Sequence, residues 1–139
     1  MSGSGEPVDR FRLREVDVYR PYPDEIPWEL LHESDPVEQR VAGYVDADYM
    51  RVAKLRGDAI GVYVVRAIDA TRFELCNLVV ARRYRNRGLG RWLLGHAIGL
   101  SETKGGREIL VREAPLRGLF ARTGFVSTGA DLLLVLSPE

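Results

Sequence analysis

Three strand-like segments joined by two short turns lie in the middle of the chain and restrict its fold more than any other feature. Residues 49–55 alternate in polarity, and residues 60–66 and 73–80 are rich in β-branched and other apolar side chains. The turns are Arg56-Gly57-Asp58 and residues 68–71. Strands joined by turns of this length and composition indicate an antiparallel meander.

The flanking sequence predicts further elements on both sides of this meander. Apolar and charged residues alternate over residues 11–19, as in an edge strand with a register change near Glu15. The other expected elements are a short helix capped by Asp24 and ending at Leu31, a helix capped by Asp35, a helix over 89–103, a strand over 108–112, a helix over 115–122 and strands over 125–128 and 132–136. The fold class is therefore α/β (α+β), with two N-terminal helices, an antiparallel β-meander, a long helix after the meander and a C-terminal hairpin.

Composition narrows the class of protein. A chain of 139 residues fits a single domain, which we place at residues 10–139 after a disordered lead-in over 1–9. The formal net charge is zero, which argues against a nucleic-acid partner. A single cysteine favours a reducing, cytoplasmic location, and no apolar run approaches the length of a membrane span.

The segment from Arg85 to Gly90 has the character of an anion-binding loop. It lies between a buried strand and an amphipathic helix, and a helix N-terminus offers unpaired amides and a partial positive charge. Glycines at 88 and 90 would let an oxygen approach those amides. Arginines are dense around them, at positions 82, 83, 85, 87 and 91. This pattern predicts a polyphosphate ligand, whereas the plainer interpretation is a glycine-rich turn with solvated arginines.

Two other phosphate loops fit less well. A Walker loop needs Gly-Lys-Ser/Thr, but Gly90 is followed by Arg91 and Trp92. A dinucleotide fingerprint needs a third glycine, but position 93 is leucine, and its loop belongs to a βαβ unit rather than a meander. A nucleotide-binding protein of another fold stays as an alternative, which would bind ATP or NAD better than coenzyme A.

The stretch YRNRGLGRWLL and its setting resemble the acetyl-CoA motif of the GNAT N-acetyltransferase superfamily, small bacterial type, over roughly residues 10–137. The resemblance implies a GNAT-like mixed sheet around the meander, acetyl-CoA as co-substrate and direct attack by a primary amine. It implies that the main chain of Leu78, Val79 and Val80 pairs with the pantetheine arm and that an amide there polarises the thioester carbonyl. It also implies cofactor contacts in the loop, from Arg85, Asn86, Arg87, Gly88, Leu89, Gly90 and Arg91.

Glu74 is the candidate catalytic residue. It resembles the general base of histone-acetylating members of the superfamily, and strand alternation places it on the face of Cys76, Leu78 and Val80, with Asn77 opposite. The alternative is a structural ion pair with Arg66 or Arg72. Cys76 itself has no neighbouring histidine and is expected to be a small core residue rather than a nucleophile.

The second half of the family pattern departs from the usual sequence. Phe120 stands where a tyrosine often protonates the thiolate, and Glu113 stands where an asparagine often contacts the cofactor. These departures keep open a second hypothesis, a non-catalytic acyl-CoA-binding sensor or regulatory module.

Other expectations concern metals, partners and the acceptor. His32 and His96 have no cluster of cysteines or carboxylates at the spacing of metal ligands, so no metal site is expected. Because members of the family are often homodimers, the resemblance makes a homodimer possible. Trp28 and Tyr22 are expected to pack in the core, with a place in the wall of an acceptor pocket as the alternative. The resemblance implies that the segment between the first strand and the meander forms the acceptor wall. Its acidic residues predict a cationic small-molecule or peptide acceptor: Asp24, Glu25, Glu29, Glu33, Asp35 and Glu38.

Overall fold

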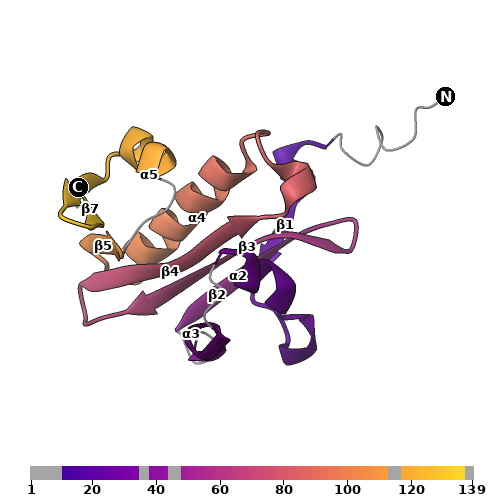
Figure 1. The fold of residues 1–139 in the computed structure, drawn as a ribbon, viewed down its shortest axis with the longest axis horizontal. Coiled ribbons are helices and arrows are strands. Elements are labelled where there is room, and N and C mark those ends of the chain that lie inside the picture. Colours follow the sequence, from indigo (N-terminus) through magenta and orange to yellow (C-terminus); the bar gives the residue numbers. More distant parts are fainter. Residues whose placement is uncertain (1–10, 35–37, 44–47, 113–116, 137–139) are drawn as a thin grey trace.

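The computed structural model describes residues 11–34, 38–43, 48–112 and 117–136 (Figure 1). Its strands join in one sheet in the order β1-β2-β3-β4-β5-β7-β6. The strands are β1 (Asp17–Tyr19), β2 (Tyr49–Leu55), β3 (Asp58–Ala67), β4 (Arg72–Val80), β5 (Glu108–Val111), β6 (Val126–Thr128) and β7 (Asp131–Val135). The α-helices are α2 (Trp28–Ser34), α3 (Glu38–Gly43), α4 (Leu89–Thr103) and α5 (Arg117–Thr123), with 3-10 turns at Leu13–Glu15, Pro23–Glu25 and Arg82–Tyr84.

This architecture confirms the predicted fold class. Strands β2, β3 and β4 form the antiparallel meander, and β4 then pairs with β5 in parallel. The parallel pair is possible because α4 provides the long connection that it requires. The hairpin of β6 and β7 completes the sheet beside β5.

Helices cover both faces of the sheet, with α2 and α3 on one side and α4 on the other (Figure 1). Alternate β3 side chains divide between the two apolar layers: Tyr63 and Val65 pack on the α4 side, whereas Val62 and Val64 pack with Leu31 of α2. Burial on both faces explains why β3 reads as a continuous apolar run.

The N-terminal elements differ from the prediction. Only Asp17–Tyr19 forms a strand within residues 11–19, because residues 13–15 close a 3-10 turn in which the Glu15 carboxylate accepts from the Arg12 amide at 3.2 Å. Asp24 lies in a second 3-10 turn rather than capping the helix. Helix α2 begins after Pro27, whose carbonyl accepts from Leu31 N at 3.1 Å.

Two further expectations for this region have different outcomes. Tyr22 is 72% exposed and Trp28 is 38% exposed, so the prediction that both pack in the core was wrong. The proposed Asp35 cap lies outside the described residues. Among those residues, no helix is long and apolar enough to cross a membrane.

Candidate active site

The N-terminus of α4 presents main-chain amides at the predicted loop. Helix α4 begins at Leu89, as expected, and its first internal bond runs from Trp92 N to the Gly88 carbonyl at 3.0 Å. The amides before Trp92 therefore have no acceptor within the helix. Asn86 and Gly88 have positive φ angles of 64° and 84°, and these two left-handed residues turn the chain into the helix. The loop from Arg85 to Gly88 is exposed.

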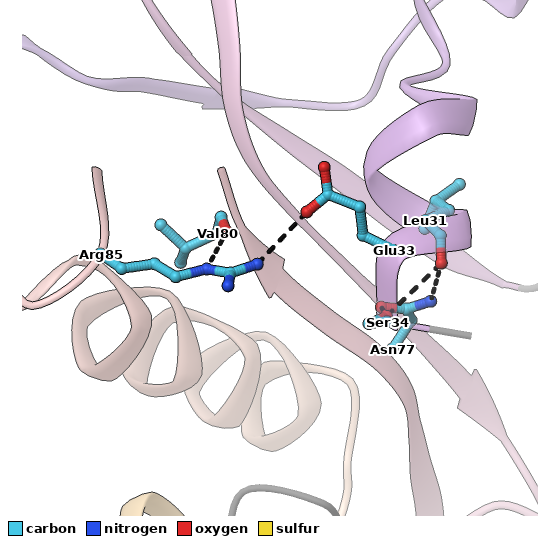
Figure 2. A network of polar contacts seen from close by, with 6 residues as sticks. All are labelled: Leu31, Glu33, Ser34, Asn77, Val80 and Arg85. Atoms are coloured by element: carbon cyan, nitrogen blue, oxygen red, sulfur yellow. Dashed lines mark hydrogen bonds and ion pairs between the residues drawn. The ribbon is translucent and has the colours of Figure 1, made fainter. Parts of the chain in front are cut away.

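Arg85 holds this loop against the end of β4 (Figure 2). Its Nε donates to the Val80 carbonyl at 2.9 Å, and its terminal nitrogen lies 3.2 Å from the Glu33 carboxylate on α2. One side chain thus connects the loop, the strand and α2. Arg85 is therefore placed to fix the loop, a role that its position in the sequence did not reveal because Glu33 lies far away in the chain.

Strands β4 and β5 separate beside this loop. They pair only over Arg72–Glu74 and Glu108–Leu110, so the later part of β4 has no partner strand on that side within the described residues. The Ala81 amide donates to Ile60 of β3 at 2.8 Å. Because main-chain groups alternate in direction along a strand, those of Leu78 and Val80 point to the open edge, whereas those of Val79 point to β3.

A bulge in β4 corrects the predicted alternation of its side chains. Val64 pairs with Asn77 and Val65 pairs with Leu75, so Cys76 is an extra residue with no opposite partner. Leu78 and Val80 consequently pack in the α4 layer, on the face opposite to Glu74. The prediction that Glu74 shares a face with Leu78 and Val80 was wrong, because one additional residue reverses the alternation.

Asn77 has structural contacts with α2, and it lies on the face of Glu74 rather than on the opposite face that strand alternation predicted. It is buried, and its Nδ2 donates to the Leu31 carbonyl at 3.3 Å, while its Oδ1 accepts from the Ser34 hydroxyl (Figure 2). These bonds satisfy the last turn of α2, whose carbonyls have no partner within the helix. Asn77 therefore attaches α2 to β4 on the face to which Glu74 also belongs.

Glu74 is buried between two arginines. Only 7% of the residue is exposed, its Oε1 lies 2.5 Å from the Arg66 guanidinium, and its Oε2 lies 3.3 Å from Arg112 Nε. The ion pair with Arg66, one of the two alternatives for this residue, is therefore present; Arg72 pairs with Asp69 instead. The contact with Arg112 was missed. The alternation of buried and less buried residues along β5 could have indicated this contact. Ile109 and Val111 are buried, so Arg112, one residue further on, belongs to the opposite face of the sheet.

Cys76 lies beside this cluster as a partly buried thiol. Burial, followed by the negative charge of Glu74, raises its pKa to about 12. At neutral pH it is almost entirely protonated, and the thiolate is the nucleophilic form. Cys76 is only partly buried and packs against the apolar layer under α2, at the margin of the core rather than within it.

Phe120 also packs in the core. It is 3% exposed, and its ring meets that of Phe125 edge to face at 5.2 Å between centroids. It offers no hydroxyl to a leaving group, whereas Glu113 lies outside the described residues. No group of three or more potential metal ligands occurs in the described part of the chain.

Comparisons with known proteins agree with this architecture. The model of the Acetyltransferase (GNAT) family matches residues 10–125, and no curated protein sequence matches the chain. A GNAT family acetyltransferase from Elizabethkingia anophelis with acetyl-CoA bound is similar in structure, with a TM-score of 0.79 and 22% identity over 89% of this chain and 99% of that one. The IAA acetyltransferase from Bacillus cereus has a TM-score of 0.74 and 30% identity over 82% of this chain and 79% of that one.

A third similar structure is the ribosomal-protein-S18-alanine N-acetyltransferase from Escherichia coli, with a TM-score of 0.75 and 16% identity over 89% of this chain and 96% of that one. The family match covers most of the sequence and includes both the meander and the loop. The chain belongs to the GNAT acetyltransferase family and is an acyltransferase.

Proposed function

We propose that this protein transfers an acetyl group from acetyl-CoA to a primary amine by direct attack. The observation that carries the proposal is the position of the uncapped α4 amides next to the open edge of β4. A diphosphate needs unpaired donors in a positive environment, and an extended amide chain can pair with a free strand edge. The similar structure from Elizabethkingia anophelis has acetyl-CoA bound, and one from Bacillus subtilis is in complex with CoA.

The proposed cofactor contacts follow from this arrangement. The amides of Arg87, Gly88, Leu89, Gly90 and Arg91 would bind the diphosphate, with Asn86 shaping the loop and Arg85 fixing it to β4. The open edge at Leu78 and Val80 would pair with the pantetheine arm. Val79 contributes its side chain to the layer under α2 rather than its main chain to that edge.

The chemistry would be a single displacement. The amine nitrogen forms a bond to the acetyl carbon, a main-chain amide at the strand edge stabilises the oxyanion, and the carbon–sulfur bond breaks. The thiolate can leave without a side-chain acid, because an ordinary thiol has a pKa of about 8.5, far below that of an alcohol. The thiolate then takes up the proton that the nitrogen loses as the amide forms. Glu74 is the proposed acceptor of the ammonium proton, because it is the buried carboxylate nearest to the bulge.

The acidic segment supports a cationic acceptor less strongly than its composition indicates, because several of its carboxylates are already paired. Glu33 is paired with Arg85, and Glu25 is paired with Lys54 and accepts from the Tyr19 hydroxyl. Asp35 lies outside the described residues. A cationic acceptor therefore stays a candidate supported mainly by Asp24 and Glu29, which lie on the exposed surface. A cytoplasmic location and a homodimer stay predictions.

Acetylation of an amine panel, with thiol release as the readout, tests this function. Glu74→Gln should lower kcat by ~10²-fold or more if Glu74 is the base, without weakening CoA binding. Asp69→Asn is the matched control, because it removes the charge of another carboxylate that is paired with an arginine. Tight CoA binding with no acetylation of any amine would instead support the acyl-CoA-binding module, for which Phe120 is the favouring observation.

A further inference from the structure

A buried carboxylate and two half-exposed arginines form a charged cluster where β4 and β5 separate. Arg66, Glu74 and Arg112 come from three neighbouring strands or their ends, and they lie on the face that carries α2. The Glu74 side chain is 9% exposed, whereas those of Arg66 and Arg112 are 55% and 57% exposed. The cluster thus buries its negative charge and presents positive charge at its surface.

Arg112 has the geometry of a carboxylate-binding group. It contacts Glu74 through Nε at 3.3 Å, which is a long contact for a charge-assisted pair. A guanidinium has further N–H donors on its terminal nitrogens, and two of its donors can bind a carboxylate side by side. The shorter contact of Glu74 is with Arg66. Arg66 therefore anchors Glu74, and Arg112 is the more loosely attached partner.

We propose that the acceptor is an amine with a carboxylate next to its amino group, as in a free amino acid, and that Arg112 binds this carboxylate. The inference rests on the proposed function. The Arg112–Glu74 ion pair is complementary to a zwitterion: the acceptor carboxylate takes Arg112, and its ammonium group takes the Glu74 oxygen that Arg112 leaves. The same exchange delivers the ammonium proton to Glu74, so that the neutral nitrogen can form its bond to the acetyl carbon.

Other amines fit this cluster less well. A diamine brings only positive charge towards Arg66 and Arg112, which are positive themselves. The N-terminus of a peptide has an amide where the amino acid has its carboxylate, so it lacks the group that Arg112 would bind. These two acceptor classes are the competing outcomes of the test.

The experiment compares each of several amino acids with the amine that its decarboxylation gives, together with a diamine and a short peptide. The wild-type protein should have a higher kcat/KM for the amino acid than for the matched amine. Arg112→Gln should lower kcat/KM for the amino acid about 10- to 100-fold, mainly through KM, and leave that of the amine unchanged or higher. The KM for acetyl-CoA should not change.

Arg72→Gln is the matched control, because Arg72 is 56% exposed and also paired with a carboxylate. It should leave the preference between the two acceptors intact. Arg112→Lys, which keeps the charge but loses the side-by-side donors, should give an intermediate preference. A melting temperature for each variant separates misfolding from lost recognition, and the ratio between two acceptors does not change when only the amount of folded protein falls.

Equal use of amino acids and matched amines by the wild-type protein would overturn the inference and leave acetyl transfer intact. Preference for the diamine or the peptide would overturn it in the same way. If Arg112→Gln lowered kcat/KM by the same factor for both acceptors, Arg112 would have a structural role, and the inference would be overturned. Absence of CoA binding and of any acetylation would refute the proposed function, and the inference with it.

Discussion

The two glycines of the loop have different surroundings, and this difference makes a matched pair of methyl additions informative. Gly88 has a φ of 84°, and a Cβ atom there would meet nothing within 4 Å. Gly90 has no positive φ, and its Cβ would lie 3.7 Å from Val80 Cγ2 and 3.9 Å from Leu119 Cδ2, in ordinary contact. Gly88→Ala thus adds a methyl beside the proposed diphosphate, whereas Gly90→Ala adds one to the protein interior. The lack of a side chain therefore leaves the amides open at Gly88, but it has no such effect at Gly90, where the sequence predicted one.

The expected stabilities follow from these positions. A left-handed conformation costs a residue with a Cβ about 1–2 kcal/mol. Gly88→Ala should therefore lower the melting temperature by about 3–8 °C in a chain of this size. Gly90→Ala replaces glycine by the best helix former in the first turn of α4, which is worth up to about 1 kcal/mol. Its melting temperature should be unchanged or higher.

The two variants should also differ in their affinity for CoA. Gly88→Ala should weaken CoA binding at least about tenfold, because either the methyl or the altered backbone displaces the amides from the phosphates. Gly90→Ala should stay within about threefold of the wild-type value. Isothermal titration calorimetry and a thermal melt measure both properties. Wild-type affinity in Gly88→Ala, at its lowered melting temperature, would refute the placement of the diphosphate.

Two further predictions concern groups beside the site. Because burial raises the pKa of Cys76 to about 12, a thiol reagent at pH 7.5 should label it far more slowly than a model thiol, and Cys76→Ala should keep acetyl transfer within a few-fold; rapid labelling and loss of activity would indicate a nucleophile. His96 Nδ1 lies 2.6 Å from the buried Tyr63 hydroxyl, and desolvation, with the charge of Arg51, lowers the pKa of His96. The unfolded state therefore binds the extra proton first, so the free energy of unfolding should fall as pH drops below about 6.5 towards the lower folded pKa. Urea unfolding at pH 7 and pH 5 should show a smaller decrease in His96→Gln than in the wild-type protein, and an equal decrease would contradict the assignment.

The sequence predicted those parts of the fold that depend on local periodicity. The meander, the residue at which α4 begins and the residue at which it ends all follow from side-chain alternation and from the glycines around the helix. The N-terminal elements were harder to predict from the sequence, because Pro23 and Pro27 interrupt regular structure at places that apolar spacing alone does not mark.

The bulge at Cys76 shows why the candidate site could be predicted only in part. Nothing in the sequence of β4 marks Cys76 as an extra residue, because the bulge is a property of the pairing with β3. Because of this one extra residue, Glu74 lies on the face of β4 opposite to Leu78 and Val80. The contacts of Arg85 with Glu33 and of Arg112 with Glu74 likewise depend on tertiary structure, because their partners are distant in the chain.

The most direct measurement is the assignment of main-chain amide signals by NMR during a titration with CoA. The amides of Gly88, Leu89, Gly90 and Arg91 should show the largest changes, followed by those of Leu78 and Val80 at the open edge of β4. Pantetheine, which has no phosphate, should affect the strand edge and leave the helix terminus unchanged. Saturation with CoA that leaves the four helix-terminal amides unshifted would contradict the account.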